Sequence, residues 1–215
     1  EFSNIASNFY VIANAGTDYF GTPTPTDNSA YPQTEADLKA KTMDIAAGTT
    51  SEPTLLTSGP LNHTSEAGKL VIVAPLQRAF AKVSVQWSKA ADGKGTVAVS
   101  KVTVKNLPAK MAFYTRGGGA LSDTYPPVGE AKAEKVIVDG NFAVNAKSEF
   151  FMAENLRGMG TATSFAEKNL VAKGPGGSLN GCTYLELLGT YTYPGATDGI
   201  SMKYCIYLGG NLMTD

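Results

Sequence analysis

The chain has 215 residues, a formal net charge of −1 and a charged fraction of only 17%. No run of Lys or Arg stands out, and nucleic-acid binding depends on such clusters, so we expect no nucleic-acid partner. A hydrophobic fraction of 43% is enough for a packed core, while one His and two Cys are too few for a His/Cys zinc site.

The first 74 residues predict few elements. An aromatic and apolar run over 9–14 predicts a short strand, and 69–73 predicts another. A helix is expected near 35–47, because Thr34 is a good N-cap residue and Asp37 follows it by three positions. So few elements bury too little surface to be stable alone, so we expect 1–74 to be a partial domain.

The segment from residue 81 to residue 104 predicts two longer strands joined by a turn at 91–95. Apolar and polar side chains alternate along both, which is the period of a half-buried strand. In the first strand the apolar face comprises Val83, Val85 and Trp87. In the second strand the phase slips between Val99 and Val102. This slip predicts a β-bulge near Ser100–Lys101.

The remaining elements complete an all-β pattern with one short helix. Further strands are predicted over 110–114, 135–138, 149–153, 183–191 and 202–208. The last two are joined by a loop containing Pro-Gly and Asp-Gly pairs, which indicates a hairpin. Many short strands separated by Gly and Pro turns are typical of a β-sandwich, and 75–215 has a comfortable length for one domain.

Residue by residue, the chain offers little chemistry, and we predict no catalytic, cofactor-binding or metal site. His63 lies in a polar loop without the nucleophile elbow that a catalytic triad requires. The glycine stretches 117–119 and 174–177 lack the Lys-Ser/Thr sequence of a phosphate loop. We therefore expect no cofactor and no enzymatic activity.

Acidic residues do not form a recognisable constellation either. Asp123, Glu130 and Glu134 are spaced too widely for a calcium loop. Glu149 and Glu154 are odd-spaced on one predicted strand, so they would point to opposite faces, which does not favour a glycosidase pair. Several tyrosines could form a sugar-stacking face, although Tyr is also common in strands. The tyrosines considered are Tyr10, Tyr19, Tyr114, Tyr125, Tyr191 and Tyr193.

Cys182 and Cys205 lie on the two strands of the predicted C-terminal hairpin. A hairpin centred near residue 196 places Cys205 opposite Leu187 and leaves the two cysteines about 17 Å apart along the strands. A disulfide needs Cα atoms within about 7 Å. We favour two unpaired thiols, and a tighter turn at Pro194–Gly195 keeps a disulfide open as the alternative.

Three stretches, in this order, resemble a known family. Pro75–Val83 (PLQRAFAKV) resembles the strand that opens the C-terminal domain of Bacteroidetes fimbrillins, the type V pilins. Phe150–Gly158 (FFMAENLRG) resembles an aromatic-rich strand of that family, and Tyr204–Asn211 (YCIYLGGN) resembles its near-terminal strand. The strand before the last one, ending in Gly-x-Tyr at Tyr191, fits as well.

The resemblance implies two transthyretin-like β-sandwich domains in tandem, 1–74 and 75–215, the first incomplete. It implies a chain that lacks the leader and first strand of a fimbrillin precursor and the last strands of its second domain. Fimbrillins polymerise by donor-strand exchange, in which the extended segment of one subunit fills a hydrophobic groove of the next. Stalk, anchor and tip subunits are all compatible with this pattern.

The function that follows is a structural subunit of a fimbria that mediates adhesion on a bacterial outer membrane, exported as a lipoprotein precursor. Its partners would be other fimbrial subunits and surface glycans or proteins of a host or bacterium. The alternative is a surface glycan-binding β-sandwich module. No apolar run approaches the ~20 residues of a membrane span.

Overall fold

The computed structural model has an all-β fold with one short helix, as the sequence predicts. It describes residues 8–15, 32, 34–44, 55–59, 61–91, 93–113, 132–153, 155 and 182–208. The N-terminal elements are β1 (Ile12–Ala13), α1 (Glu35–Ala40), β2 (Thr42–Asp44), β3 (Leu56–Thr57), β4 (Thr64–Glu66), β5 (Lys69–Val71) and β6 (Gln77–Arg78). The following strands are β7 (Phe80–Gln86), β8 (Thr96–Pro108), β9 (Lys110–Ala112), β10 (Lys132–Phe142), β11 (Lys147–Ala153), β12 (Tyr184–Thr192) and β13 (Ile200–Tyr207).

The helix begins where the sequence predicts but ends early. The Thr34 hydroxyl accepts a hydrogen bond from the Asp37 backbone N–H, and the Asp37 carboxylate accepts one from the Thr34 N–H, which completes the capping box. Helix α1 then ends at Ala40, so the expectation of a helix over about 35–47 is wrong. The reason is tertiary, because the next residues form β2 and pair with β9.

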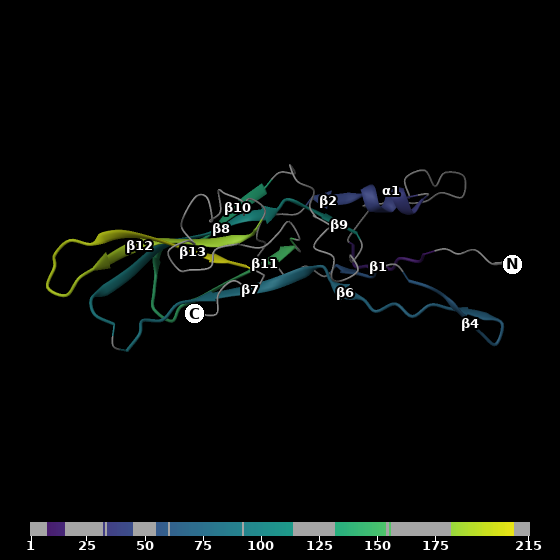
Figure 1. Cartoon of the computed structure of the whole chain (residues 1–215), viewed down its shortest axis with the longest axis horizontal. Coiled ribbons are helices and arrows are strands. Elements are labelled where there is room, and N and C mark those ends of the chain that lie inside the picture. Colours follow the sequence, from purple (N-terminus) through teal and green to yellow (C-terminus); the bar gives the residue numbers. More distant parts are fainter. Residues whose placement is uncertain are drawn as a thin grey trace.

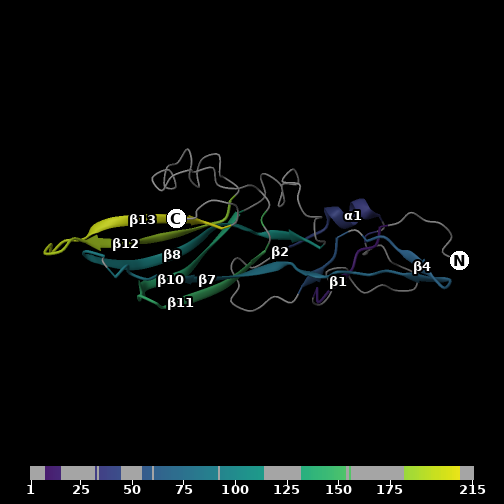
Figure 2. The same ribbon diagram turned by 60° about the horizontal axis from the view of Figure 1, so that its bottom comes forward.

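Two antiparallel sheets form the main body of the molecule. The first has the strand order β10-β8-β12-β13, and the second consists of β11 and β7. Their facing sides share one hydrophobic core, in which Val102, Val104 and Phe150 have no exposed surface. The two sheets therefore pack face to face, the arrangement of a β-sandwich. Figure 2 shows the strands of both sheets running along the long axis of the molecule.

The strand alternation predicted from the sequence is confirmed in β7 and β8. Val85 is buried, and Val83 and Trp87 pack against the same core. In β8 the register with β12 shifts so that Ser100 has no opposite residue, which is the predicted bulge.

The N-terminal segment contributes small sheets that are joined to the main body by strand pairing (Figure 1). The three-stranded sheet has the order β1-β3-β6, and β2 pairs with β9. Strands β6 and β9 both lie after residue 75, so pairing crosses the boundary we placed between 1–74 and 75–215. The division into two domains stays a prediction.

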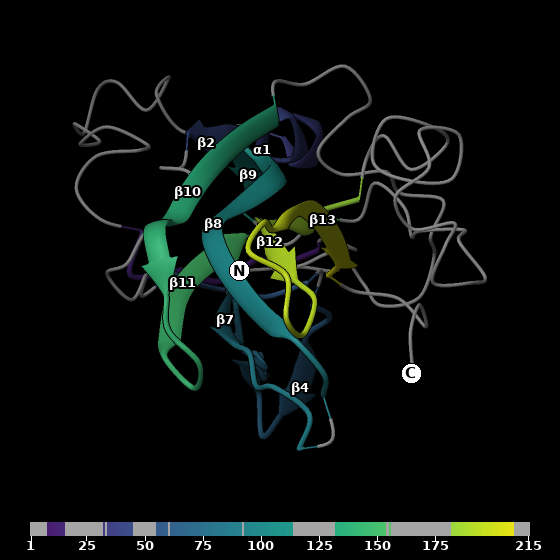
Figure 3. The same ribbon diagram turned by 90° about the vertical axis from the view of Figure 1, so that its left-hand side faces the viewer.

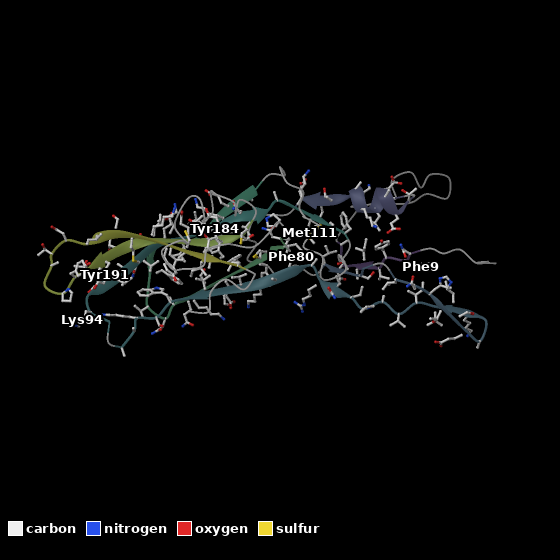
Figure 4. The ribbon with its side chains drawn as sticks, in the orientation of Figure 1. Phe9, Phe80, Lys94, Met111, Tyr184 and Tyr191 are labelled. Carbon is white, nitrogen blue, oxygen red and sulfur yellow. The ribbon has the colours of Figure 1, made fainter. Side chains whose placement is uncertain are left out.

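A second core lies where these small sheets meet the sandwich. Its buried residues are Leu55, Met111, Ala112 and Ala153, and Phe80 and Met43 pack against them. Phe80 and Met111 lie close to the middle of the long axis in Figure 4. The molecule is therefore elongated, with the N-terminal sheets at one end and the β12–β13 loop at the other (Figure 1).

Candidate functional site

One face of β13 carries four apolar side chains that point toward the sandwich interior, and the first and last of them are exposed. Ile206 lies opposite the core residue Leu185, and residues directly opposite each other project from the same face of a sheet. The alternate residues on this face are Ile200, Met202, Tyr204 and Ile206. Ile200 is 56% exposed and Ile206 is 36% exposed, whereas Cys205 on the opposite face is fully buried. At the C-terminal end of this strand the interior side chain Ile206 is therefore less covered than its exterior neighbours Cys205 and Tyr207.

The cause of this exposure is the small width of the second sheet. Among the described strands it contains only β7 and β11, so β7 has a partner along one edge alone. Alternate residues of an unpaired edge direct their N–H and C=O groups away from the sheet. Val83 and Val85 of β7 belong to the same core that Met202 and Tyr204 of β13 contact. We call the edge of β7 that has no partner among the described strands, together with the four-residue row of β13, the open side.

The other side of the sandwich is closed by covalent connection and hydrogen bonds. Strands β10 and β11 belong to different sheets and are joined by the short turn at 143–146. The Trp87 indole N–H donates to the Phe142 carbonyl at 2.9 Å, and the Asn145 N–H donates to the Trp87 carbonyl at 2.9 Å. Viewed along the long axis, β10 and β11 lie together at the left, and β13 extends to the right (Figure 3). Among the described strands, β7 therefore has no partner on the side of β13.

The outer face of the four-stranded sheet carries a row of alternating charges, one from each strand. Glu134 of β10 lies 3.3 Å from the Lys105 ammonium of β8, which lies 3.4 Å from Glu186 of β12. Glu186 in turn contacts Lys203 of β13 at 2.8 Å. This row ties the four strands together across the outer face of the sheet.

Mutual contacts shift the pKa values within this row. Burial raises the pKa of Glu186, but the hydrogen bond from Lys203 and the charge of Lys105 outweigh it, so the net pKa lies below its usual value. Hydrogen bonding to Glu186 raises the pKa of Lys203. Burial lowers the pKa of Lys105, yet its two carboxylate neighbours raise it overall. These shifts favour the charged forms of Glu186, Lys105 and Lys203, so the contacts among them stabilise the sheet.

Next to the charges, the outer face of the β12–β13 hairpin is buried. Cys182, Tyr184, Cys205 and Tyr207 form a cluster in which each residue is less than a tenth exposed. The two tyrosine rings lie 6.1 Å apart, and burial raises the pKa of each to about 12. Both cysteines are free thiols. Burial also raises the pKa of Cys205, which suppresses its thiolate form and hence its reactivity.

The register of this hairpin differs by one residue from the simplest expectation. Cys205 lies opposite Glu186 and not opposite Leu187. The difference arises because the connecting loop centres between Gly195 and Ala196, with a turn closed by the hydrogen bond from the Ala196 N–H to the Tyr193 carbonyl.

Of the residues considered for catalysis, His63 and Glu149 contact different parts of the fold. The His63 ring packs edge-to-face on Phe9, with their centroids 5.8 Å apart. Glu149 contacts Lys147, Lys82 and the Ser84 hydroxyl, and these contacts lower its pKa to about 2. Such a carboxylate is a poor general base at neutral pH.

Several predicted candidates lie outside the described residues: Tyr19, Tyr114, Gly117–Gly119, Asp123, Tyr125, Glu130, Glu154 and Gly174–Gly177. Glu134 belongs to the charged row described above. Within the described ranges, no three His, Cys, Asp or Glu side chains gather as metal ligands. No helix in this part of the chain is long and apolar enough to cross a membrane.

Two of the tyrosines considered for sugar stacking do meet. Tyr191 and Tyr193 pack edge-to-face with their ring centroids 4.8 Å apart. The Tyr191 hydroxyl donates to the Lys94 carbonyl at 2.7 Å, and both residues lie near the far end of the elongated molecule (Figure 4). Tyr10 lies elsewhere, where its hydroxyl donates to Glu35.

Comparison with known proteins gives one match. The sequence profile of a family described as a domain of unknown function, DUF4906, matches residues 150–215. This segment begins in β11 and includes the β12–β13 hairpin that carries the exposed row of the open side. No curated protein and no solved structure matches the chain significantly.

Proposed function

We propose that this protein is a structural subunit of a bacterial surface fimbria of the fimbrillin type, and that it joins neighbouring subunits by strand addition. The observation that carries the proposal is the open side. Among the described strands one edge of β7 has no partner, and the facing strand β13 carries the exposed side chains Ile200 and Ile206. An added strand would pair with the edge and cover these side chains.

The physical basis is β-augmentation. An extended segment placed beside β7 would form main-chain hydrogen bonds along up to seven residues. Its alternate side chains would point into the sandwich and cover Ile200 and Ile206. Fully burying an Ile side chain contributes about 1.5–3 kcal/mol, and covering the exposed parts of Ile200 and Ile206 would contribute a share of that to the joint. No catalytic group is needed for this role, and we propose none.

The sequence supports the same proposal. The match to DUF4906 covers the C-terminal part of the sandwich, and that family is associated with Bacteroidetes fimbrillin-like proteins. The fimbrillin-like stretches at Phe150 and Tyr204 lie within the matched residues, on β11 and β13. A fimbrial subunit would act at the bacterial outer surface, where adhesion ligands are reached.

The proposal is tested by incorporation into surface filaments. Cells producing the protein are sheared, and the filaments are labelled with an antibody to it and viewed by electron microscopy. We expect label along the filaments, and loss of label for Ile206→Lys, which places a charge in the open side. Val136→Lys is the matched control, because Val136 is 40% exposed and lies on the outer face of the same sheet. Protein that is well expressed but absent from every filament would refute the proposal.

Glycan binding is the second candidate, and the Tyr191–Tyr193 pair favours it. Tyr193 is 57% exposed, and its partner ring is held by the hydrogen bond to Lys94, so an aromatic surface is presented in a fixed position. Glycan-array binding that is lost in Tyr193→Ala and kept in Ile206→Lys would support this function. An array without any bound glycan would contradict it.

A further inference from the structure

A chain of side-chain hydrogen bonds joins the two sheets at the end of the sandwich where β11 finishes. Asn155 follows β11 of the second sheet, and its side-chain amide donates to the Thr183 hydroxyl at 2.8 Å. Thr183 directly precedes β12 of the first sheet, and its hydroxyl donates to the backbone carbonyl of Asn106 in β8 at 3.0 Å. The Asn155 amide also reaches this carbonyl, at 3.4 Å. We call Asn106, Thr183 and Asn155 the clasp.

Asn106 lies at a break in the regular pairing of β8. Between Val104 and Leu107, β8 contains one residue more than the paired strand β10, which is a β-bulge. Asn106 has a φ of 57°, in the left-handed region that Asn tolerates better than most residues. The pairing of β8 with β12 runs as far as Lys105, which lies opposite Tyr184. Strand β8 therefore parts from β12 at Asn106.

The Asn106 side chain continues the contact with the segment before β12 across this break. Its amide donates to the Cys182 carbonyl at 3.1 Å, two residues before the last paired residue, Tyr184. A side-chain amide of this kind can make the hydrogen bond that the backbone no longer provides. The backbone carbonyl of Asn106 accepts from Thr183 and Asn155 at the same time. Both its side chain and its carbonyl are thus bonded to other parts of the sandwich.

The clasp is well covered, so its hydrogen bonds matter to one another. Thr183 is only 2% exposed, and Asn106 and Asn155 are half-buried. A buried hydroxyl costs free energy unless it is hydrogen-bonded, and the Thr183 hydroxyl both accepts and donates within the clasp. Removing one member leaves the others with fewer partners, and a network of this kind responds to substitution as a unit.

The opposite end of the sandwich is held by different bonds. There the Trp87 indole N–H donates to the Phe142 carbonyl, and the Ser148 hydroxyl donates to the Ile137 carbonyl at 3.4 Å. The short turn between β10 and β11 also links the two sheets covalently at that end. Among the described strands, β11 has backbone pairing with β7 alone, within its own sheet. At its C-terminal end, Asn155 supplies the hydrogen bonds to the first sheet.

We propose that the clasp is a conformational lock that fixes two features at once: the position of the end of β11 on the first sheet, and the residue at which β8 parts from β12. A slip of β8 by one residue would bring Lys105 or Leu107 to the clasp and exchange the two faces of the strand. The covered polar groups of the clasp would then lose their partners. This role concerns the sandwich itself and does not depend on the fimbrial function.

The proposal is tested by a double-mutant cycle in the full chain, with urea denaturation as the measurement. We expect Asn155→Ala and Thr183→Val each to raise the equilibrium constant of unfolding roughly tenfold. The double variant should also show a rise of roughly tenfold, because each change already breaks the bond that the other removes. Thr190→Val is the matched control, because Thr190 is an exposed threonine of β12 itself, and it should unfold like the wild type. A hundredfold rise in the double variant, the product of two independent effects, would overturn the lock.

Amide hydrogen exchange tests whether the clasp acts locally. In Asn155→Ala we expect exchange to accelerate about tenfold at the last residues of β11, Met152 and Ala153, and to stay unchanged at its first residues, Lys147 and Ser148. Asn155→Asp keeps the shape of the side chain but removes its N–H donor, so it should accelerate the same amides. Equal acceleration at both ends of β11 in these variants would show that Asn155 does not position its end.

Discussion

The two adjacent phenylalanines of β11 provide a sharp test of the sandwich. Phe150 lies opposite Val83 and has no exposed surface, and it packs in the core between the two sheets. Phe151 is half-buried on the opposite face, where its ring centroid lies 5.9 Å from the Lys82 ammonium. We therefore compare Phe150→Ala with Phe151→Ala, which remove the same atoms from opposite faces of one strand.

The expected costs differ severalfold. Removing a fully buried Phe side chain destabilises a domain by about 3–5 kcal/mol, through lost transfer free energy and the cavity that remains. Removing the outer ring loses partial burial and a cation–π contact, together about 1 kcal/mol. For a chain of this size these values correspond to about 10 °C and about 3 °C in melting temperature.

Urea denaturation followed by tryptophan fluorescence measures both free energies of unfolding. The single tryptophan, Trp87, packs against the same core and therefore reports on the sandwich. If Phe151→Ala costs as much as Phe150→Ala, or more, the faces of β11 are assigned incorrectly. A one-residue slip of register would produce that result, because it exchanges the two faces of a strand.

Three further predictions concern the first sheet. Gly189→Ala should destabilise the protein by roughly 3 kcal/mol or more in the same assay, because the added Cβ would lie 2.1 Å from the Ala98 carbonyl oxygen; a neutral result would refute this close approach. Cys182 and Cys205 should resist Ellman's reagent in the folded protein and release two thiols in denaturant, and an intact mass two hydrogens lower would instead reveal a disulfide. Glu186→Gln should cost about 1 kcal/mol at pH 7. Because the pKa of Glu186 is lowered in the folded protein, the wild type loses this stabilisation as the pH falls through that pKa. The difference in free energy of unfolding between the wild type and Glu186→Gln should therefore vanish in acid. A difference that persists in acid would contradict the ion pairs of Glu186.

Local sequence patterns determined much of the sandwich. The alternation around Val83 and Val85 identified the buried face of β7, since a strand has a period of two. The phase slip after Val99 located the bulge at Ser100. The capping box at Thr34 fixed the start of the helix, because the motif involves only residues three positions apart.

Local patterns predict less well the elements that depend on distant partners. Helix α1 ends earlier than its sequence predicts, because the residues after it form β2 and pair with β9, which lies far away in the chain. The hairpin register was one residue off, which moved Cys205 relative to its expected neighbour. Such register choices follow from loop geometry, which strand alternation does not specify.

The sequence alone determined an all-β chain, the alternating strands and the absence of a recognisable catalytic motif, because these follow from local residue patterns. The tertiary structure decided which apolar faces are covered. The residues of β13 alternate, but only the folded molecule shows Ile206 exposed on the inner face and Cys205 buried on the outer face, where it packs with Tyr184 and Tyr207. Burial depends on what the rest of the chain places against a strand, so the open side emerges only from the folded molecule.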